Sequence, residues 1–285
     1  MIFGNRQQHR FLRIFQPYNF INFITFLTLF VPASGFATDW QEEKGDHFII
    51  YYQKDEPLIK EIKHKAEQYY TQIADDLGYA RYSNFWQWER RAKIYVYPSL
   101  EEFQSQTGEK GWSHGLAVYS KREIYTYSAH EGFLDGILPH EITHLIFRDF
   151  VGLEGQVPVW LDEGIAQWEE PEKRKLARKV ARWLVQHDKD YHLQDLTATD
   201  VRKLTDQMQV NYFYMQSVSV VDYLIRNFGG QRFTQFCREL RDGKKFNDAL
   251  QAVYPSIESI YVLDMRWRDD VMKEESNLEI RFNDK

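Results

Sequence analysis

The sequence is poor in cysteine, in long apolar runs and in clustered positive charge. Cys237 is the single cysteine among 285 residues, so no disulfide can form within one chain. Its neighbours are apolar at helical spacing, which predicts a buried structural thiol. No stripe of Lys and Arg stands out against the net charge of −6, which argues against nucleic acid as a partner.

The chain is instead rich in apolar and aromatic residues. Hydrophobic residues make up 43% of it and aromatic residues 16%. This is enough to bury one core, or two lobes that share an interface. Disorder over most of the length is excluded by the same composition.

The N-terminal segment, residues 1–37, differs from the rest. It holds three arginines and no acidic residue, then the mainly apolar run Phe20–Val31, then small residues at Gly35 and Ala37. This is the order of a secretory signal peptide, so we expect an exported protein, periplasmic or secreted. The alternative is an uncleaved signal that anchors the protein to a membrane. A membrane span needs about 20 apolar residues, which favours cleavage.

Hydrophobic periodicity predicts an α+β fold. Strands are expected at 47–53, 92–97, 115–119 and 123–127, with helices over 57–77 and after Ser99. From residue 133 the pattern turns helical, with helices near 138–150, 159–169, 172–188, 212–228, 230–242, 245–253 and 256–273. Pro171 and Pro255 are expected at helix starts. We therefore predict a small mixed sheet lobe carrying the active-site helices (38–170), followed by a helical lobe (171–285).

A metal-binding pattern lies on the first of these later helices, in His140-Glu141-Ile142-Thr143-His144. Residues four apart share one face of a helix, so both imidazoles can reach one zinc ion. Glu141 projects about 100° away from His140, beside the metal rather than on it. The alternative is two surface histidines on an amphipathic helix.

A third ligand is predicted on the next helix, within Trp160–Ala166. Two His and one Glu are a standard ligand set of catalytic zinc, and Glu163 supplies the carboxylate. Apolar neighbours predict its burial, and a buried carboxylate needs a cation. The alternatives are a solvated Glu163, or Asp162 as ligand, although Asp162 faces another side of the helix. Gly164 is expected to allow close approach to the first helix.

Together, His140–His144 and Trp160–Ala166 resemble the gluzincin metallopeptidases, and most closely the short peptidase MA-like group. A looser similarity runs through Tyr214–Leu224 and Phe228-Gly229. The resemblance implies a thermolysin-like active-site lobe, Zn²⁺ and peptide hydrolysis. It also implies an oxyanion donor from the helical lobe, where Tyr214 matches the position.

The chemistry expected of such a site follows from these assignments. Zinc would polarise the scissile carbonyl and activate water, while Glu141 takes a proton from the water and passes it to the leaving amine. Tyr212 is the next candidate after Tyr214 for the oxyanion donor. We expect the substrate to be an extended peptide along an edge strand, with the hairpin at 115–127 as the candidate strand.

Several other polar groups have two interpretations. His114 is either a further site residue or a solvated loop histidine. Glu169 and Glu170 could accept hydrogen bonds from the ligand imidazoles, but a solvated helix end is the favoured interpretation. The basic residues between Lys173 and Arg182 are interpreted as a solvated face rather than a surface for acidic partners.

Three hypotheses for function follow. The favoured one is an active zinc peptidase. The second is a catalytically silent binding or assembly module that keeps the zinc fold, against which the intact Glu141 argues. The third is a metal-free helical protein with accidental His spacing, against which Glu163 argues.

Overall fold

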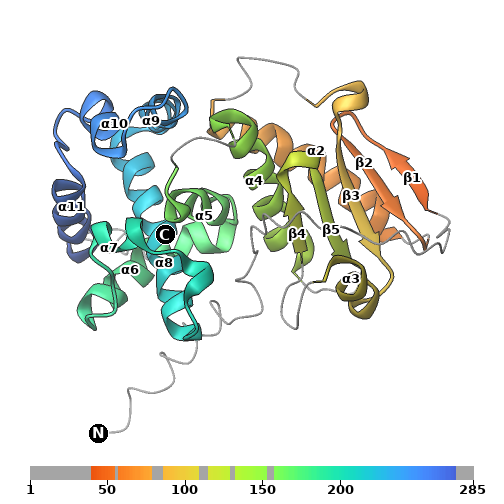
Figure 1. Ribbon diagram of the computed structural model, residues 1–285, viewed down its shortest axis with the longest axis horizontal. Helices are drawn as coiled ribbons and strands as arrows, with labels where there is room; N and C mark the ends of the chain where they lie inside the picture. The colour runs from red at the N-terminus through yellow and green to blue at the C-terminus, as the bar shows by residue number, and fades with distance from the viewer. Residues whose placement is uncertain are drawn as a thin grey trace, which may run out of the picture.

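The computed structural model describes residues 40–54, 57–78, 86–108, 115–128, 132–152 and 157–273 (Figure 1). The predicted signal peptide, His114 and the residues after 273 lie outside this part of the chain. The α+β prediction is confirmed, because a sheet-containing part is followed by a helical part beside it. The predicted division between residues 170 and 171 stays a prediction.

Five strands form one mixed sheet in the order β1-β2-β3-β5-β4. Strands β2, β3 and β5 are parallel to one another, and β1 and β4 are antiparallel at the two edges. The strands are β1 (Gln41–Lys44), β2 (Phe48–Tyr52), β3 (Ala92–Tyr97), β4 (Gly115–Val118) and β5 (Glu123–Tyr127). The predicted hairpin therefore exists, and its strand β4 is an edge strand.

In chain order, the first of the described helices are α2 (Pro57–Asp76), α3 (Leu100–Thr107), α4 (Leu138–Val151) and α5 (Val159–Trp168). Those that follow are α6 (Pro171–Gln186), α7 (Leu193–Ala198), α8 (Gln207–Phe228), α9 (Gly230–Arg241), α10 (Phe246–Val253) and α11 (Ile260–Met272). Short 3₁₀ turns are η2 (Trp88–Arg90), η3 (Tyr119–Lys121) and η5 (Val201–Lys203), and η4 (Phe133–Ile137) is a π-helical turn.

Helices cover both faces of the sheet, because successive side chains of a strand point to opposite faces and apolar side chains lie on both of them. Ile94 and Ile124 are fully buried in the core that includes residues of α2 and α4. On the other face, Phe103 of α3 packs with Tyr97 and Tyr127. Helix α4 lies against both β4 and α2, so it is held between the sheet edge and the longest helix of this part.

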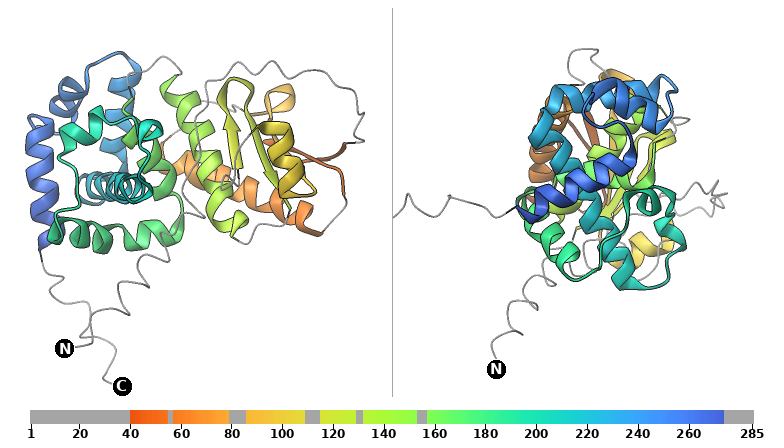
Figure 2. Two further views of the ribbon diagram at one scale, coloured as in Figure 1. Left: turned by 60° about the horizontal axis from the view of Figure 1, so that its bottom comes forward. Right: turned by 90° about the vertical axis from the view of Figure 1, so that its left-hand side faces the viewer.

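Helix α8 is the centre of the helical part, and Figure 2 shows the other helices of this part arranged around it. It packs against α5, α6 and α9. The contact with α5 depends on Gly164, since a Cβ there would lie 2.6 Å from the Ser217 carbonyl oxygen and 2.8 Å from Val221 Cγ2. The close approach predicted for Gly164 therefore serves α8 rather than α4.

Element boundaries differ from the sequence prediction where polar residues start an element. Strand β1 and helix α7 are not predicted, since neither shows a clear apolar period. Helix α8 begins at Gln207, five residues before its predicted start, with the Asp206 side chain accepting from Met208 N. Helix α11 begins after Ser259, which caps it, so the predicted start at Pro255 is wrong.

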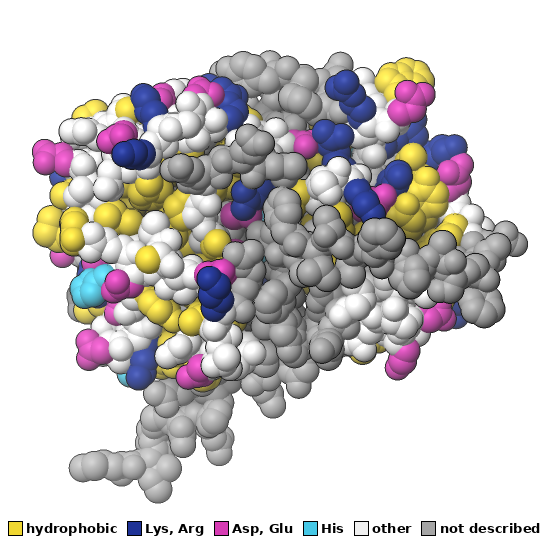
Figure 3. Space-filling view, in the orientation of Figure 1, with side chains coloured by type: hydrophobic (Ala, Val, Ile, Leu, Met, Phe, Trp, Pro, Cys, Tyr) yellow, Lys and Arg dark blue, Asp and Glu magenta, His cyan; other side chains and the backbone are white. Residues whose placement is uncertain are grey.

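Cys237 is buried, as its apolar neighbours predict, and burial raises the pKa of its thiol. In the described part of the chain, every helix is too short or too polar to cross a membrane. Over the helical part, acidic and basic side chains of the described residues lie interspersed on the face seen in Figure 3.

The packing at Gly164 yields a stability prediction. In Gly164→Ala the new methyl group overlaps the α8 backbone, so we expect a loss of about 1–3 kcal/mol in the free energy of unfolding. Urea denaturation measures it. Gly230→Ala is the control, because its Cβ would approach only the Asp76 carbonyl oxygen, at 3.7 Å. Equal stability of the two variants would contradict the close α5–α8 contact.

Candidate metal centre

Helix α4 presents the predicted pattern from a wholly buried position. His140, Glu141 and His144 are all buried, with Pro139 in the first helical turn. The helix continues directly from the π-helical turn η4, an arrangement frequent at functional sites. Gly152 follows its last residue with a positive φ of 81°. Both imidazoles therefore project from one rigid, desolvated surface.

Helix α5 brings Glu163 to the two imidazoles. Glu163 Oε2 lies 3.5 Å from His144 Nε2 and 3.7 Å from His140 Nε2, and the two Nε2 atoms are 3.1 Å apart. Ligand atoms of a tetrahedral zinc site, with bonds of about 2.0–2.1 Å, lie roughly 3.3–3.4 Å from one another. The triangle formed by the three atoms thus has the size of one face of such a site.

The hydrogen bonds on the far side of each ring define which nitrogen faces the triangle. His140 Nδ1 lies 2.8 Å from Glu170 Oε1, and His144 Nδ1 lies 3.1 Å from Asp162 Oδ1. Because a carboxylate only accepts, each neutral ring carries its proton on Nδ1 and turns a lone pair of Nε2 inward. Three buried acceptor atoms then face one another, an arrangement that a cation stabilises. Among the described residues, this is the one His/Cys/Asp/Glu cluster of that kind.

Ion pairs fix the two outer carboxylates. Asp162 Oδ2 accepts from Arg148 Nε and Nη2, at 3.1 and 2.7 Å. Burial raises the pKa of Asp162, but Arg148 and His144 outweigh it and lower the pKa to about 2. Glu170 Oε1 accepts from Lys173 Nζ at 2.6 Å. Both outer carboxylates therefore contact a cation as well as an imidazole.

The pKa values of Glu163, His140 and His144 shift in directions that favour positive charge within the triangle. Burial raises the pKa of Glu163, but the two imidazoles outweigh it and lower the pKa. Burial lowers the pKa of His140 and of His144, yet the carboxylates around them raise both. The pocket thus favours positive charge between these atoms, whether a proton or a metal ion supplies it.

Glu141 faces the edge of the sheet. A Cβ at Gly115, the first residue of β4, would lie 3.4 Å from Glu141 Oε1 and 2.7 Å from Ile137 Cγ2. The backbone of the edge strand therefore passes directly beside this carboxylate, and a Cβ at Gly115 would overlap the Ile137 side chain. The strand expected to hold a peptide and the expected general base are neighbours.

Two tyrosines lie near the carboxylates of the site. Burial raises the pKa of Tyr214 well above its usual value, and Glu163 and Glu141 raise it further. Tyr119, which the sequence pattern does not single out, packs its ring edge-on to His144 at 6.0 Å between centroids. Tyr212 packs on Trp183 instead, at 6.1 Å. Of the two predicted candidates, Tyr214 is thus the one coupled to the site.

The outer polar residues differ from their favoured interpretation. Glu169 and Glu170 are buried rather than solvated, and Glu170 accepts from the imidazole of His140. Asp162 contacts His144, a role that its position next to Glu163 does not reveal. The solvated basic face is wrong for Lys173, which is buried. Arg178 and Arg182 donate to carbonyl groups at the end of α11.

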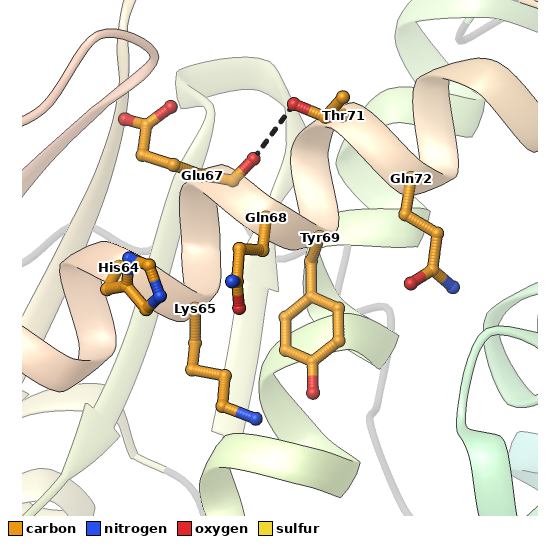
Figure 4. A pocket seen from close by; sticks show the side chains of 7 residues that line it. All are labelled: His64, Lys65, Glu67, Gln68, Tyr69, Thr71 and Gln72. Atoms are coloured by element: carbon orange, nitrogen blue, oxygen red, sulfur yellow. Dashed lines mark hydrogen bonds between the residues drawn. The ribbon is translucent and has the colours of Figure 1, made fainter.

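Helix α2 donates hydrogen bonds to η4 and to the end of α5. Figure 4 shows a hollow on α2 lined by His64, Lys65, Glu67, Gln68, Tyr69, Thr71 and Gln72. Lys65 and Tyr69 donate to Asp135 of η4, and Gln72 Nε2 donates to Glu169 Oε2 at 3.2 Å. The residues of the metal triangle do not line this hollow, so it is separate from the candidate centre.

Glu169 gives a prediction for pH dependence. Burial, followed by the charge of Asp76, raises its pKa to about 8. Between about pH 4.5 and pH 8 the folded state therefore holds a proton that the unfolded chain has lost, so stability falls as pH rises through this window. We expect Glu169→Gln to remove that part of the fall, measured by urea denaturation at about pH 5 and about pH 9. Exposed Glu172→Gln is the control, and an equal pH dependence in wild type and Glu169→Gln would contradict the assignment.

Comparison with known proteins agrees with the motifs. No curated protein matches the chain. The family model of the peptidase MA superfamily matches residues 81–273, more than half of the 285 residues, and spans the helices that carry His140, His144 and Glu163. The chain therefore belongs to the peptidase MA superfamily.

Proposed function

We propose that the chain is a zinc-dependent peptidase of the gluzincin type, with His140, His144 and Glu163 as metal ligands and Glu141 as general base. The observation that carries the proposal is the buried triangle of three acceptor atoms at 3.1–3.7 Å. Two His and one Glu leave one position of a tetrahedral zinc site open, which is the arrangement of a catalytic site. Family membership supports a peptidase in general.

Each residue has a defined task in the proposed reaction. Bound zinc supplies a Lewis acid that polarises the scissile carbonyl and lowers the pKa of water. Glu141 accepts the proton that this water loses and delivers it to the leaving amine, so its carboxylate must lie beside the ligands and not among them. The raised pKa of Tyr214 keeps its phenol protonated, as a donor to the oxyanion requires.

The substrate we propose is a peptide or protein segment in extended conformation. Such a segment adds to β4 as a further strand, since main-chain hydrogen bonds to a sheet edge bind peptides independently of their side chains. Gly115 lies beside Glu141, so a peptide paired at this end of β4 passes the general base. We propose no nucleic-acid partner.

The location we propose is outside the cytoplasm. It rests on residues 1–37, whose order of arginines, apolar run and small residues supports a cleaved signal peptide. If the signal is not cleaved, the same segment anchors the protein to a membrane.

A catalytically silent zinc module of the same fold is the alternative. Such a module needs His140, His144 and Glu163 to bind the metal, but it does not need Glu141. The position of Glu141 beside both the metal triangle and the edge strand supports the catalytic function, because a binding module has no need of a general base there. The third hypothesis, a metal-free protein with accidental His spacing, is disfavoured because it gives no reason for a third metal-ligating side chain, Glu163, to meet both imidazoles.

Glu141→Gln separates catalysis from metal binding. The amide keeps the shape of the side chain but accepts no proton, so we expect hydrolysis of a quenched casein substrate to fall by about 10²–10⁴-fold. Zinc content, measured on the same sample, should stay at one ion per chain. Exposed Glu258→Gln is the control and should keep full activity. Zinc without activity in wild type would support the silent module.

Tyr214→Phe tests the oxyanion donor. Loss of the hydroxyl should lower kcat by about 10²–10³-fold, with little change in KM or zinc content, because the donor acts on charge that develops in the transition state. Tyr212→Phe is the matched control two residues away, and it should behave as wild type. A larger effect in Tyr212→Phe than in Tyr214→Phe would reverse the assignment.

A further inference from the structure

Behind each ligand imidazole lies a carboxylate that a cation holds in turn. On one side, Arg148 stands one helical turn after His144 and donates two hydrogen bonds to Asp162 Oδ2. Asp162 Oδ1 accepts from His144 Nδ1 at 3.1 Å. The guanidinium, the carboxylate and the imidazole thus form a continuous chain that ends at the metal position.

The second chain is built from different elements. Lys173 Nζ on α6 donates to Glu170 Oε1 at 2.6 Å, and the same oxygen lies 2.8 Å from His140 Nδ1. Lys173 is only 3% exposed, although lysine is almost never fully buried unless it is paired. Its helix carries none of the metal ligands, so the helical part of the protein reaches the metal position through this residue.

Arg148 has a further restraint from the sheet. Its guanidinium lies over the Tyr119 ring at 5.9 Å, and that ring also packs on His144. Tyr119 follows the last residue of β4. Tyr119, at the end of the edge strand, therefore contacts both Arg148 and one ligand imidazole.

Stability alone does not account for these two cations. A buried ion pair gains little over well-packed apolar residues, because desolvation offsets the attraction. Direct electrostatics does not account for them either, since a positive charge near the site repels a metal ion. Orientation does account for them: a carboxylate held from behind fixes the tautomer and the plane of the ring in front of it.

We propose that Arg148 and Lys173 are positioning residues of the metal centre, acting through Asp162 and Glu170 on the imidazoles of His144 and His140. The proposal rests on the zinc site proposed above. It adds that ligand geometry depends on two cations that touch neither metal nor substrate, one of them from α6.

The direction of the effect distinguishes orientation from charge. If the cations act only by charge, then Arg148→Met or Lys173→Met removes a repulsion and tightens metal binding. If they act by positioning, each variant weakens binding, by about 10–100-fold as for other outer partners of ligand histidines. The conservative Arg148→Lys keeps the charge but not the two-pronged contact, so it should fall between wild type and Arg148→Met.

The experiment uses the full-length protein and Co²⁺ as a probe of zinc sites. Titration gives the dissociation constant, and the visible absorption of the bound Co²⁺ reports its ligand geometry. The controls are Arg226→Met, which breaks a 2.6 Å pair with Asp270, and Lys244→Met, which breaks a pair with Glu239. Both should leave affinity and spectrum unchanged.

A double-mutant cycle tests the route of the effect. Asp162→Asn should weaken Co²⁺ binding, and Arg148→Met added to it should weaken binding little further, since both act on His144. Additive losses, unchanged affinity in both Met variants, or tighter binding would overturn the proposal. If Arg148→Met does not fold, Arg148→Lys takes its place in the cycle with the same criteria. Failure of wild type to bind Co²⁺ would instead contradict the zinc site itself.

Discussion

The structure around the candidate centre depends on one constraint, the convergence of three acceptor atoms in a buried position. His140 Nε2, His144 Nε2 and Glu163 Oε2 lie 3.1–3.7 Å from one another. Lone pairs at this distance repel unless a proton or a metal ion lies between them. Neither helix gains from this contact by itself, so the fold must hold α4 and α5 together by other means.

Those means are distributed over the whole molecule. The sheet edge and α2 hold α4 from one side, while α8 holds α5 through the glycine contact at Gly164. Ion pairs reach the imidazoles from α4 itself and from α6, by way of Asp162 and Glu170. The sheet part supplies the edge strand beside Glu141, and the helical part supplies Tyr214. One continuous apolar core runs through both parts.

The sequence predicts the parts of the site that depend on local spacing and leaves out those that depend on packing. Two histidines four apart on a helix, and a glutamate among apolar residues on the next, are enough to define the triangle. The hydrogen-bond partners of the imidazoles depend on how α4 and α5 cross and on where α6 begins. Residue spacing along the sequence therefore does not reveal the contact of Asp162 with His144. For Glu170 it favours a solvated position, whereas the residue is buried. Tight packing at Gly164 is predicted, but against the wrong helix. Strand β1 pairs with β2, which its polar residues do not indicate.

The most direct test of the metal centre is a crystal structure of the purified protein with anomalous data collected on both sides of the zinc absorption edge. The account predicts one strong zinc-specific peak, within about 2.0–2.2 Å of Nε2 of His140, Nε2 of His144 and a carboxylate oxygen of Glu163. A folded protein with zinc at other residues, or with these three side chains turned away from one another and no zinc between them, would contradict it.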